Sequence, residues 1–86
     1  MEKTFKVSSY SKVKALSGAI IKSLEEDYDV RLDAIGAGAV NQAVKAVAAA
    51  KQMTDITFFS DIDFFDVSIN GEQKSGIKIT IKKLHP

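Results

Sequence analysis

Residues 34–48 read AIGAGAVNQAVKAVA, and this stretch decides how the chain folds. An apolar segment that we predict as a strand over residues 29–36 runs into the sequence Gly36-x-Gly38, which breaks it. An alanine-rich segment follows, and we predict a helix over residues 39–53. Its small side chains allow the helix to lie close to a sheet or to another helix.

The N-terminal part of the chain has the same strand-then-helix order. Lys3–Ser8 alternates apolar and polar side chains, as a half-buried strand does. Lys12–Tyr28 is predicted as a helix, because its apolar residues recur every three or four positions: Val13, Leu16, Ile20 and Leu24. Serines 8, 9 and 11 lie between the two elements, and we expect them to cap this helix.

The last third of the chain is predicted to be a β-hairpin. Asn70-Gly71 favours a two-residue turn in which both residues have positive φ. This turn pairs Ile62 with Ile79 and Phe64 with Ile77 on the core face, and a four-residue loop would keep the same two faces. The opposite face then carries Phe65, Val67 and Ile69. The chain is therefore an α/β (α+β two-layer) protein of order β-α-β-α-β-β.

Composition limits the classes of protein to be considered. The chain has 86 residues, a net charge of +1, 45% hydrophobic residues and no cysteine. We expect one domain over residues 1–86 and a cytoplasmic protein, with neither a secretory signal nor an apolar run of the roughly 20 residues that cross a bilayer. Lysines dominate the first 24 residues, which permits a local basic surface or simply a solvated helix face.

Catalytic chemistry finds little support in the sequence. The only histidine is His85, next to the C-terminus, so most pairs of nucleophile and base cannot be built. The dinucleotide-binding motif that begins like Gly36-x-Gly38 requires a third glycine at position 41, where this chain has Asn41. A tight turn therefore explains the two glycines better than a nucleotide-binding loop does. The acidic residues Asp61, Asp63 and Asp66 are best explained as exposed strand charges. We expect no enzyme, metal, cofactor or small-molecule substrate.

Residues 34–48 resemble the central motif of the stage V sporulation protein S family. Phe5-Lys6-Val7-Ser8 and Ile69-Asn70-Gly71-Glu72 are also similar to that family, so that the resemblance spans nearly the whole chain. It implies an Alba-like fold, with two helices packed on a four-stranded mixed sheet. It also implies a bacterial cytoplasmic protein that regulates spore development and coat assembly.

Alba-type proteins bind DNA or RNA as dimers, through lysines before the first helix and arginines before the second. Gly36 and Gly38 fall about where those arginines would be, and Tyr10 and Ser11 fall where the paired lysines would be. The resemblance therefore leaves a reduced set of nucleic-acid contacts: Tyr10, Lys12, Lys14, Asn41 and Lys45. The alternative is a structural or protein-interaction module that has lost nucleic-acid binding.

Asn41 and Lys45 are one helical turn apart and share an exposed face. Helix propensity gives no reason for an asparagine there. This pair is either a solvated helix start or a contact patch for phosphate or a partner chain.

An oligomer is expected from the hairpin. Phe65, Val67 and Ile69 form an apolar patch away from the core, and a monomer seldom leaves such a patch in water. A small domain also gains stability by burying it against a second copy. We therefore predict a homodimer or a dimer of dimers, with the hairpin and the second helix at the contact.

Overall fold

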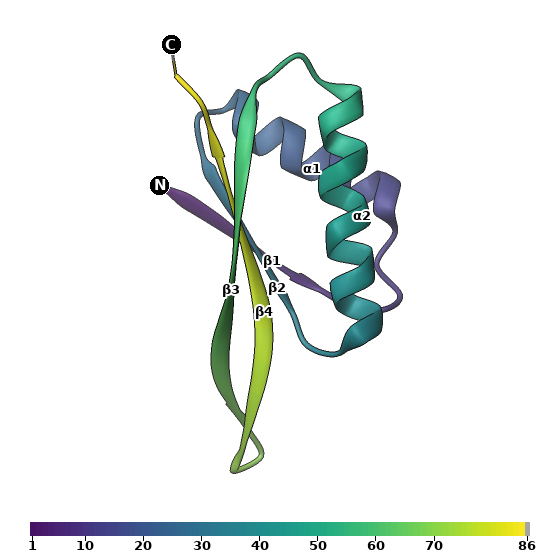
Figure 1. The fold of residues 1–86 in the computed structure, drawn as a ribbon, viewed down its shortest axis with the longest axis vertical. Helices are drawn as coiled ribbons and strands as arrows, with labels where there is room; N and C mark the ends of the chain where they lie inside the picture. Colours follow the sequence, from purple (N-terminus) through teal and green to yellow (C-terminus); the bar gives the residue numbers. More distant parts are fainter. Residues whose placement is uncertain (86) are drawn as a thin grey trace.

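The computed structural model describes residues 1–85 of the chain and confirms the predicted order of elements (Figure 1). The elements along the chain are β1 (Glu2–Val7), α1 (Val13–Glu25), β2 (Asp29–Ala34), α2 (Ala37–Met53), β3 (Phe58–Ile69) and β4 (Glu72–Lys83). The two hairpin strands have 12 residues each, twice the length of β1 and β2. The hairpin therefore extends beyond the body of the sheet.

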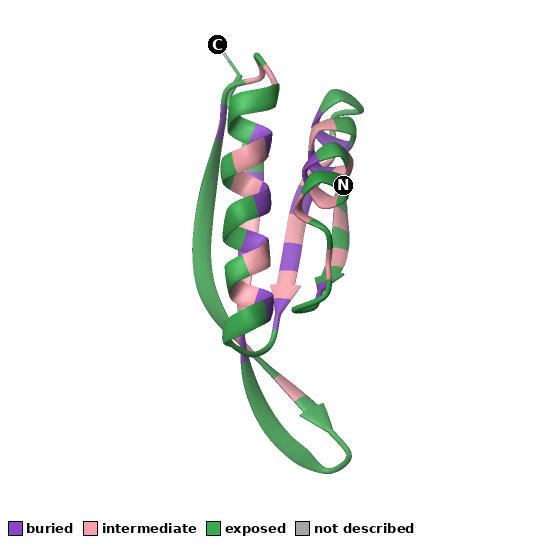
Figure 2. Ribbon diagram, turned by 90° about the vertical axis from the view of Figure 1, so that its right-hand side faces the viewer, coloured by how far each residue is buried: buried purple, intermediate pink, exposed green. Residues whose placement is uncertain are grey.

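The four strands form one mixed sheet in the order β1-β2-β4-β3. β1 and β2 are parallel, whereas β4 is antiparallel to both of its neighbours. Both helices pack on one face of this sheet, and the other face has no covering layer within residues 1–85 (Figures 1 and 2). This is the two-layer arrangement predicted from the sequence, with β1 and β3 as the edge strands.

Alanines form the buried face of α2. Four of them are buried, each about one turn from the next: Ala39, Ala43, Ala46 and Ala50. Opposite them, the core is filled by large side chains from α1 and the sheet: Ile20, Leu24, Leu32, Ile79 and Ile81. Small residues on the helix and large ones on the sheet interdigitate, which lets α2 lie close to the strands.

Some predicted boundaries and caps are wrong. α1 begins at Val13 with Lys12 as its N-cap, and no side chain caps it. The serines instead close the preceding loop, where the Ser8 hydroxyl accepts a hydrogen bond from the Tyr10 amide and the Ser11 hydroxyl accepts one from the Ser8 amide. Ser8 is followed by four residues before the helix, too many for it to reach the helix's free N–H groups.

The predicted turn and register of the hairpin are confirmed. Asn70 and Gly71 both have positive φ, 51° and 79°. Ile62 pairs with Ile79 and Phe64 with Ile77.

The predicted burial of Ile62 and Phe64 is wrong. Ile79 is 2% exposed, but its partner Ile62 is 61% exposed and Phe64 is 71% exposed. The alternation of side chains along the strand decides which face of the sheet these residues lie on. Burial requires in addition that a helix covers that part of the face. Phe58, the first residue of β3, is buried, but beyond it the helices do not cover β3 or the hairpin tip, which remain open to solvent (Figure 2).

Gly36 and Gly38 shape the start of α2 in two different ways. Gly36 is the N-cap and has φ 94°, in the region that favours glycine. Gly38 lies in the first turn of α2, and a Cβ atom there would come within 2.8 Å of the Ser9 Cβ. One glycine therefore permits the turn, and the other permits contact between α2 and the loop after β1.

Valine at either position should destabilise the protein. We expect Gly36→Val to lower the free energy of unfolding by about 1–3 kcal/mol through backbone strain. Gly38→Val should lower it by about 1–3 kcal/mol because the side chain overlaps Ser9. Urea denaturation measures both effects.

Gly18→Val provides the matched control for these variants. Gly18 lies in α1, and a Cβ atom added there would meet no neighbouring atom within 4 Å, so valine should leave stability unchanged or slightly raised. Equal stability of all three variants would contradict this account of the turn.

Candidate functional site

Two loops meet at one end of the sheet. Because β1 and β2 are parallel, the loop that follows β1 and the loop that follows β2 leave the sheet at the same edge. Ser9 of the first loop packs against Gly38, and the Gln42 side-chain amide donates a hydrogen bond of 2.8 Å to the Ser11 carbonyl. These contacts fix the first loop to the first two turns of α2, and we call this region the loop end.

The predicted nucleic-acid contacts lie at or near the loop end, with Lys45 the furthest from it, in the third turn of α2. Tyr10 is 91% exposed, and Lys12, Lys14, Asn41 and Lys45 are exposed as well. Within residues 1–85, none of these three lysines has a carboxylate within 4 Å. In the same range, the one side-chain hydrogen bond of Asn41 is donated to the neighbouring Gln42 side chain, at 3.4 Å. The loop end therefore presents unpaired cations and a free aromatic ring.

The opposite end of the sheet is different, because its three strand lysines are paired with acidic residues. Lys3 contacts Glu26 at 3.3 Å, and Lys82 contacts Asp29 at 3.9 Å. Lys83 forms an ion pair with Asp27. Lys22 and Lys51, in the last turns of α1 and α2, have no carboxylate within 4 Å among residues 1–85. The strand lysines are thus neutralised at this end, whereas the lysines around the loop end are unpaired.

Lys83 connects the sheet to the C-terminus of α1. Its ammonium group also donates a hydrogen bond of 3.2 Å to the Leu24 carbonyl in the last turn of α1, which accepts a second hydrogen bond from the Asp27 amide. The hydrogen bond that Lys83 donates to the Asp27 carboxylate, together with the charge of Lys83, holds the pKa of Asp27 below its ordinary value.

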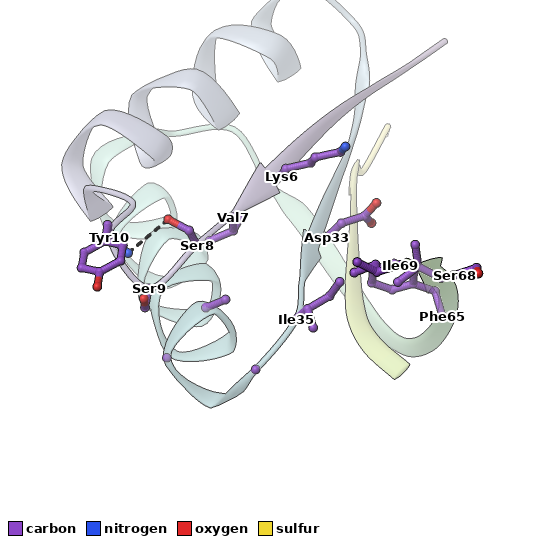
Figure 3. A pocket seen from close by; sticks show the side chains of 14 residues that line it. Lys6, Val7, Ser8, Ser9, Tyr10, Asp33, Ile35, Phe65, Ser68 and Ile69 are labelled. Atoms are coloured by element: carbon purple, nitrogen blue, oxygen red, sulfur yellow. Dashed lines mark hydrogen bonds between the residues drawn. The ribbon is translucent and has the colours of Figure 1, made fainter. Parts of the chain in front are cut away.

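A cleft of about 740 Å³ lies between the loop end and the hairpin (Figure 3). One wall is formed by the loop after β1 and includes Ser8, Ser9 and Tyr10. The other wall is formed by the hairpin, and Lys6 and Ile35 come from the ends of β1 and β2. The cleft therefore combines an apolar lining with a few polar groups, as ligand sites in proteins commonly do.

The predicted interface residues Phe65, Val67 and Ile69 form the hairpin wall of this cleft. They share the open face of the sheet, as the sequence predicts, but Phe65 is half-buried. Its ring covers Gly76, where an added Cβ would lie 2.6 Å from the ring, and the Arg31 guanidinium lies 5.3 Å from the ring centre. The oligomer interface expected at these residues stays a prediction.

Sequence reasoning missed part of the cleft. Lys6, Ser9 and Ile35 line it, although none was singled out as a contact. Their common property is position, since each lies at or just after the C-terminal end of a parallel strand. Open α/β sheets commonly bind ligands beyond the C-terminal ends of their strands, and this rule would have identified the three residues.

The acidic residues of β3 are divided between the two faces of the strand. Asp61 and Asp63 lie on the open face, whereas Asp66 lies on the other face and accepts a hydrogen bond from Ser75 at 3.3 Å. Within residues 1–85, no cluster of three potential metal ligands is found. In the same range, no helix is both long enough and apolar enough to span a membrane.

The fold defines an Alba-like protein. The structure is similar to that of Alba from Thermoplasma volcanium, with a TM-score of 0.64 over 96% of this chain and 100% of that chain. The sequence identity is only 11%, so this similarity establishes the fold alone.

The sequence identifies the family within this class. The model of the stage V sporulation protein S family matches residues 3–84. The chain therefore belongs to that family, which confirms the resemblance seen in residues 34–48.

The Asp27–Lys83 pair predicts a dependence of stability on pH. The pKa of Asp27 is lower in the folded protein than in the unfolded chain, so its stabilising effect is present above the unfolded pKa. The effect is lost as the pH falls through the folded pKa. Asp27→Asn should therefore be less stable than the wild type at pH 7 and approach it in acid.

Thermal unfolding at pH 7 and at pH values below the ordinary carboxyl pKa of about 4 measures this difference. Asn is a suitable replacement because Asp27 has φ 66°, a conformation that Asn tolerates. A difference in Tm between variant and wild type that stays constant down to acid pH would contradict the assignment.

Proposed function

We propose that this protein is a non-catalytic, cytoplasmic regulator of sporulation, concerned with spore development and coat assembly, that acts by binding nucleic acid. Family membership supports the link to sporulation, and the Alba-like fold is compatible with nucleic-acid binding. The observation that carries the proposal is that Lys12, Lys14 and Lys45 are unpaired, whereas the strand lysines at the opposite end of the sheet are engaged by carboxylates.

Lys12, Lys14 and Lys45 lie on the elements that meet at the loop end. A phosphate backbone attracts such cations and releases condensed counterions when they bind. The strand lysines of the opposite end, Lys3, Lys82 and Lys83, are engaged by Glu26, Asp29 and Asp27 and have less to offer a phosphate. A protein of net charge +1 can in this way have one basic surface.

Binding should therefore depend steeply on salt. Affinity for DNA or RNA, measured by fluorescence anisotropy at several salt concentrations, should fall as salt rises. Alanine at Lys12, Lys14 or Lys45 should each reduce the slope of log affinity against log salt by about one. The absence of binding to any duplex or single strand at low salt would refute the proposal.

Lys82→Ala is the matched control. Lys82 is half-exposed on the open face of β4 and lies 3.9 Å from Asp29 at the opposite end of the sheet. It carries the same charge, so its removal should leave the salt slope close to that of the wild type. An equal reduction for Lys82 and Lys14 would mean that the basic contact surface is not confined to the loop end.

The second candidate is an interaction module with an Alba-like fold that has lost nucleic-acid binding. Bare backbone at Gly36 and Gly38 favours it, because no basic side chain extends from the turn before α2. Exposed apolar side chains on β3 favour it as well. The salt titration discriminates between the two functions.

A second copy of this chain is the partner that we propose for those apolar side chains, in a homodimer or a dimer of dimers. Ile62 and Phe64 lie on the helix-facing side of β3. Val44 of α2 is 48% exposed and lies away from the flank where Gln42 contacts the loop before α1 and Met53 contacts α1 itself. α2 is the helix on the β3 side of the helix layer and α1 lies on its other flank (Figure 2), so the exposed flank of α2 faces the margin where β3 is uncovered.

The acidic residues of β3 oppose direct pairing of two β3 edges, because like charges would meet along the strands. Contact through side chains on the helix-facing side avoids that repulsion. A two-fold axis would place the same patch on both subunits. The side chains of Ile62, Phe64 and Val44 are more exposed than those of Phe65, Val67 and Ile69, which line the cleft.

Phe64→Asp should dissociate the assembly. Each subunit would lose an apolar contact and gain a buried charge, so the dissociation constant should rise by about a hundredfold or more. Light scattering coupled to size exclusion measures the mass. A wild-type mass of one chain at micromolar concentration would refute the dimer.

Two further variants locate the interface. Phe59 is exposed on the open face of the same strand, and Phe59→Asp should leave the mass unchanged. Phe65→Asp tests the patch predicted from the sequence. Dissociation by Phe65→Asp, with none by Phe64→Asp, would place the contact on the open face instead.

A further inference from the structure

The cleft between the loop end and the hairpin is not needed for contacts to the backbone of a duplex. Phosphates on the surface of a duplex reach the exposed lysines of the loop end without entering it. The cleft nevertheless has a volume of about 740 Å³, which is in the range of pockets that hold small organic groups. It also lies beyond the C-terminal ends of β1 and β2, where open α/β sheets bind ligands.

Three kinds of group line this cleft. Tyr10 is 91% exposed and makes no side-chain contact that would cover its ring within residues 1–85, so the ring is open to a ligand. Ile35, Val67 and Ile69 provide an apolar surface. Lys6 provides a cation that has no carboxylate within 4 Å in the same part of the chain.

Asp33 also lines the cleft, and it would repel an anion if it were unpaired. The Arg31 side chain donates a hydrogen bond of 2.6 Å to the Asp33 carboxylate. This ion pair offsets the charge of Asp33, and Lys6 remains the uncompensated charge. The cleft is therefore suited to an anionic ligand with a flat apolar part.

We propose that the cleft holds one unpaired nucleotide of a single strand, with its base against Tyr10 and the apolar wall and its phosphate near Lys6. The inference rests on the proposed function and specifies its ligand. A base stacked in a duplex cannot enter a cleft of this kind, whereas an unpaired base can. Stacking on an aromatic ring tolerates every base, so the cleft selects single strands over duplexes without reading a sequence.

Affinities for a short RNA that does not pair with itself, and for the same RNA as a blunt duplex, test this inference. Tyr10→Ala should weaken single-strand binding by about 5- to 100-fold and weaken duplex binding much less. Tyr10→Phe retains the ring and should restore the single-strand affinity. Ile35→Ser should also weaken single-strand binding, while Leu84→Ser, at a similarly exposed apolar residue of the opposite end, should not.

Amide chemical shifts of the labelled protein locate the ligand. The single strand should shift the amides of Ser9, Ile35 and Val67, whereas the duplex should shift those around Lys14 and Lys45. Duplex binding that depends on the lysines, with no effect of Tyr10→Ala or Ile35→Ser on the single strand, would overturn the cleft and leave the proposed function intact. No binding of either RNA would refute both.

Adenosine monophosphate separates a strand from a free nucleotide. The single strand should bind more tightly than this monomer, because the lysines of the loop end contact its other phosphates. Equal affinities, with identical shifts in the cleft, would overturn the assignment to a strand.

Discussion

Close approach between α2 and the rest of the protein is the constraint on which this structure depends. Ala39, Ala43, Ala46 and Ala50 bring the helix onto the sheet, and Gly38 brings its first turn against Ser9. A larger side chain at any of these positions would push the helix outward, since protein interiors leave few voids to absorb added volume. The same approach lets Gln42 reach the Ser11 carbonyl, so the packing of the core also positions the loop end.

A narrow helix layer has consequences at the margin of the sheet. The two helices cover β1, β2 and β4, and the long strand β3 extends past them (Figure 2). Ile79 and its partner Ile62 have the same orientation and opposite environments, so that one fills the core and the other is open to solvent. Apolar side chains at such a margin are suited to a partner, and the acidic residues on the same strand disfavour uncontrolled pairing of strand edges.

The two ends of the sheet differ in how their charged side chains are paired. Asp27, Asp29 and Glu26 pair with lysines at one end, and the lysines of the other end have no such partners within residues 1–85. The separation follows from topology, because parallel strands bring both crossover loops to one edge. The cleft opens at that edge, next to the hairpin, so basic side chains, an exposed aromatic ring and an apolar wall lie together.

The order of elements, the two-residue turn at Asn70-Gly71, the hairpin register and the family could be predicted from the sequence, because these depend on local periodicity, turn chemistry and a long motif. The sequence also indicated that Gly36 and Gly38 would have special geometry. The exposure of Ile62 and Phe64, and the meeting of Lys6, Ile35 and Tyr10 at one cleft, became visible in the folded structure. Periodicity assigns a side chain to a face, but burial depends on which elements cover that face and where they end. Residues that are far apart in the sequence meet at the cleft because of how the strands pair, and no local sequence pattern specifies that pairing.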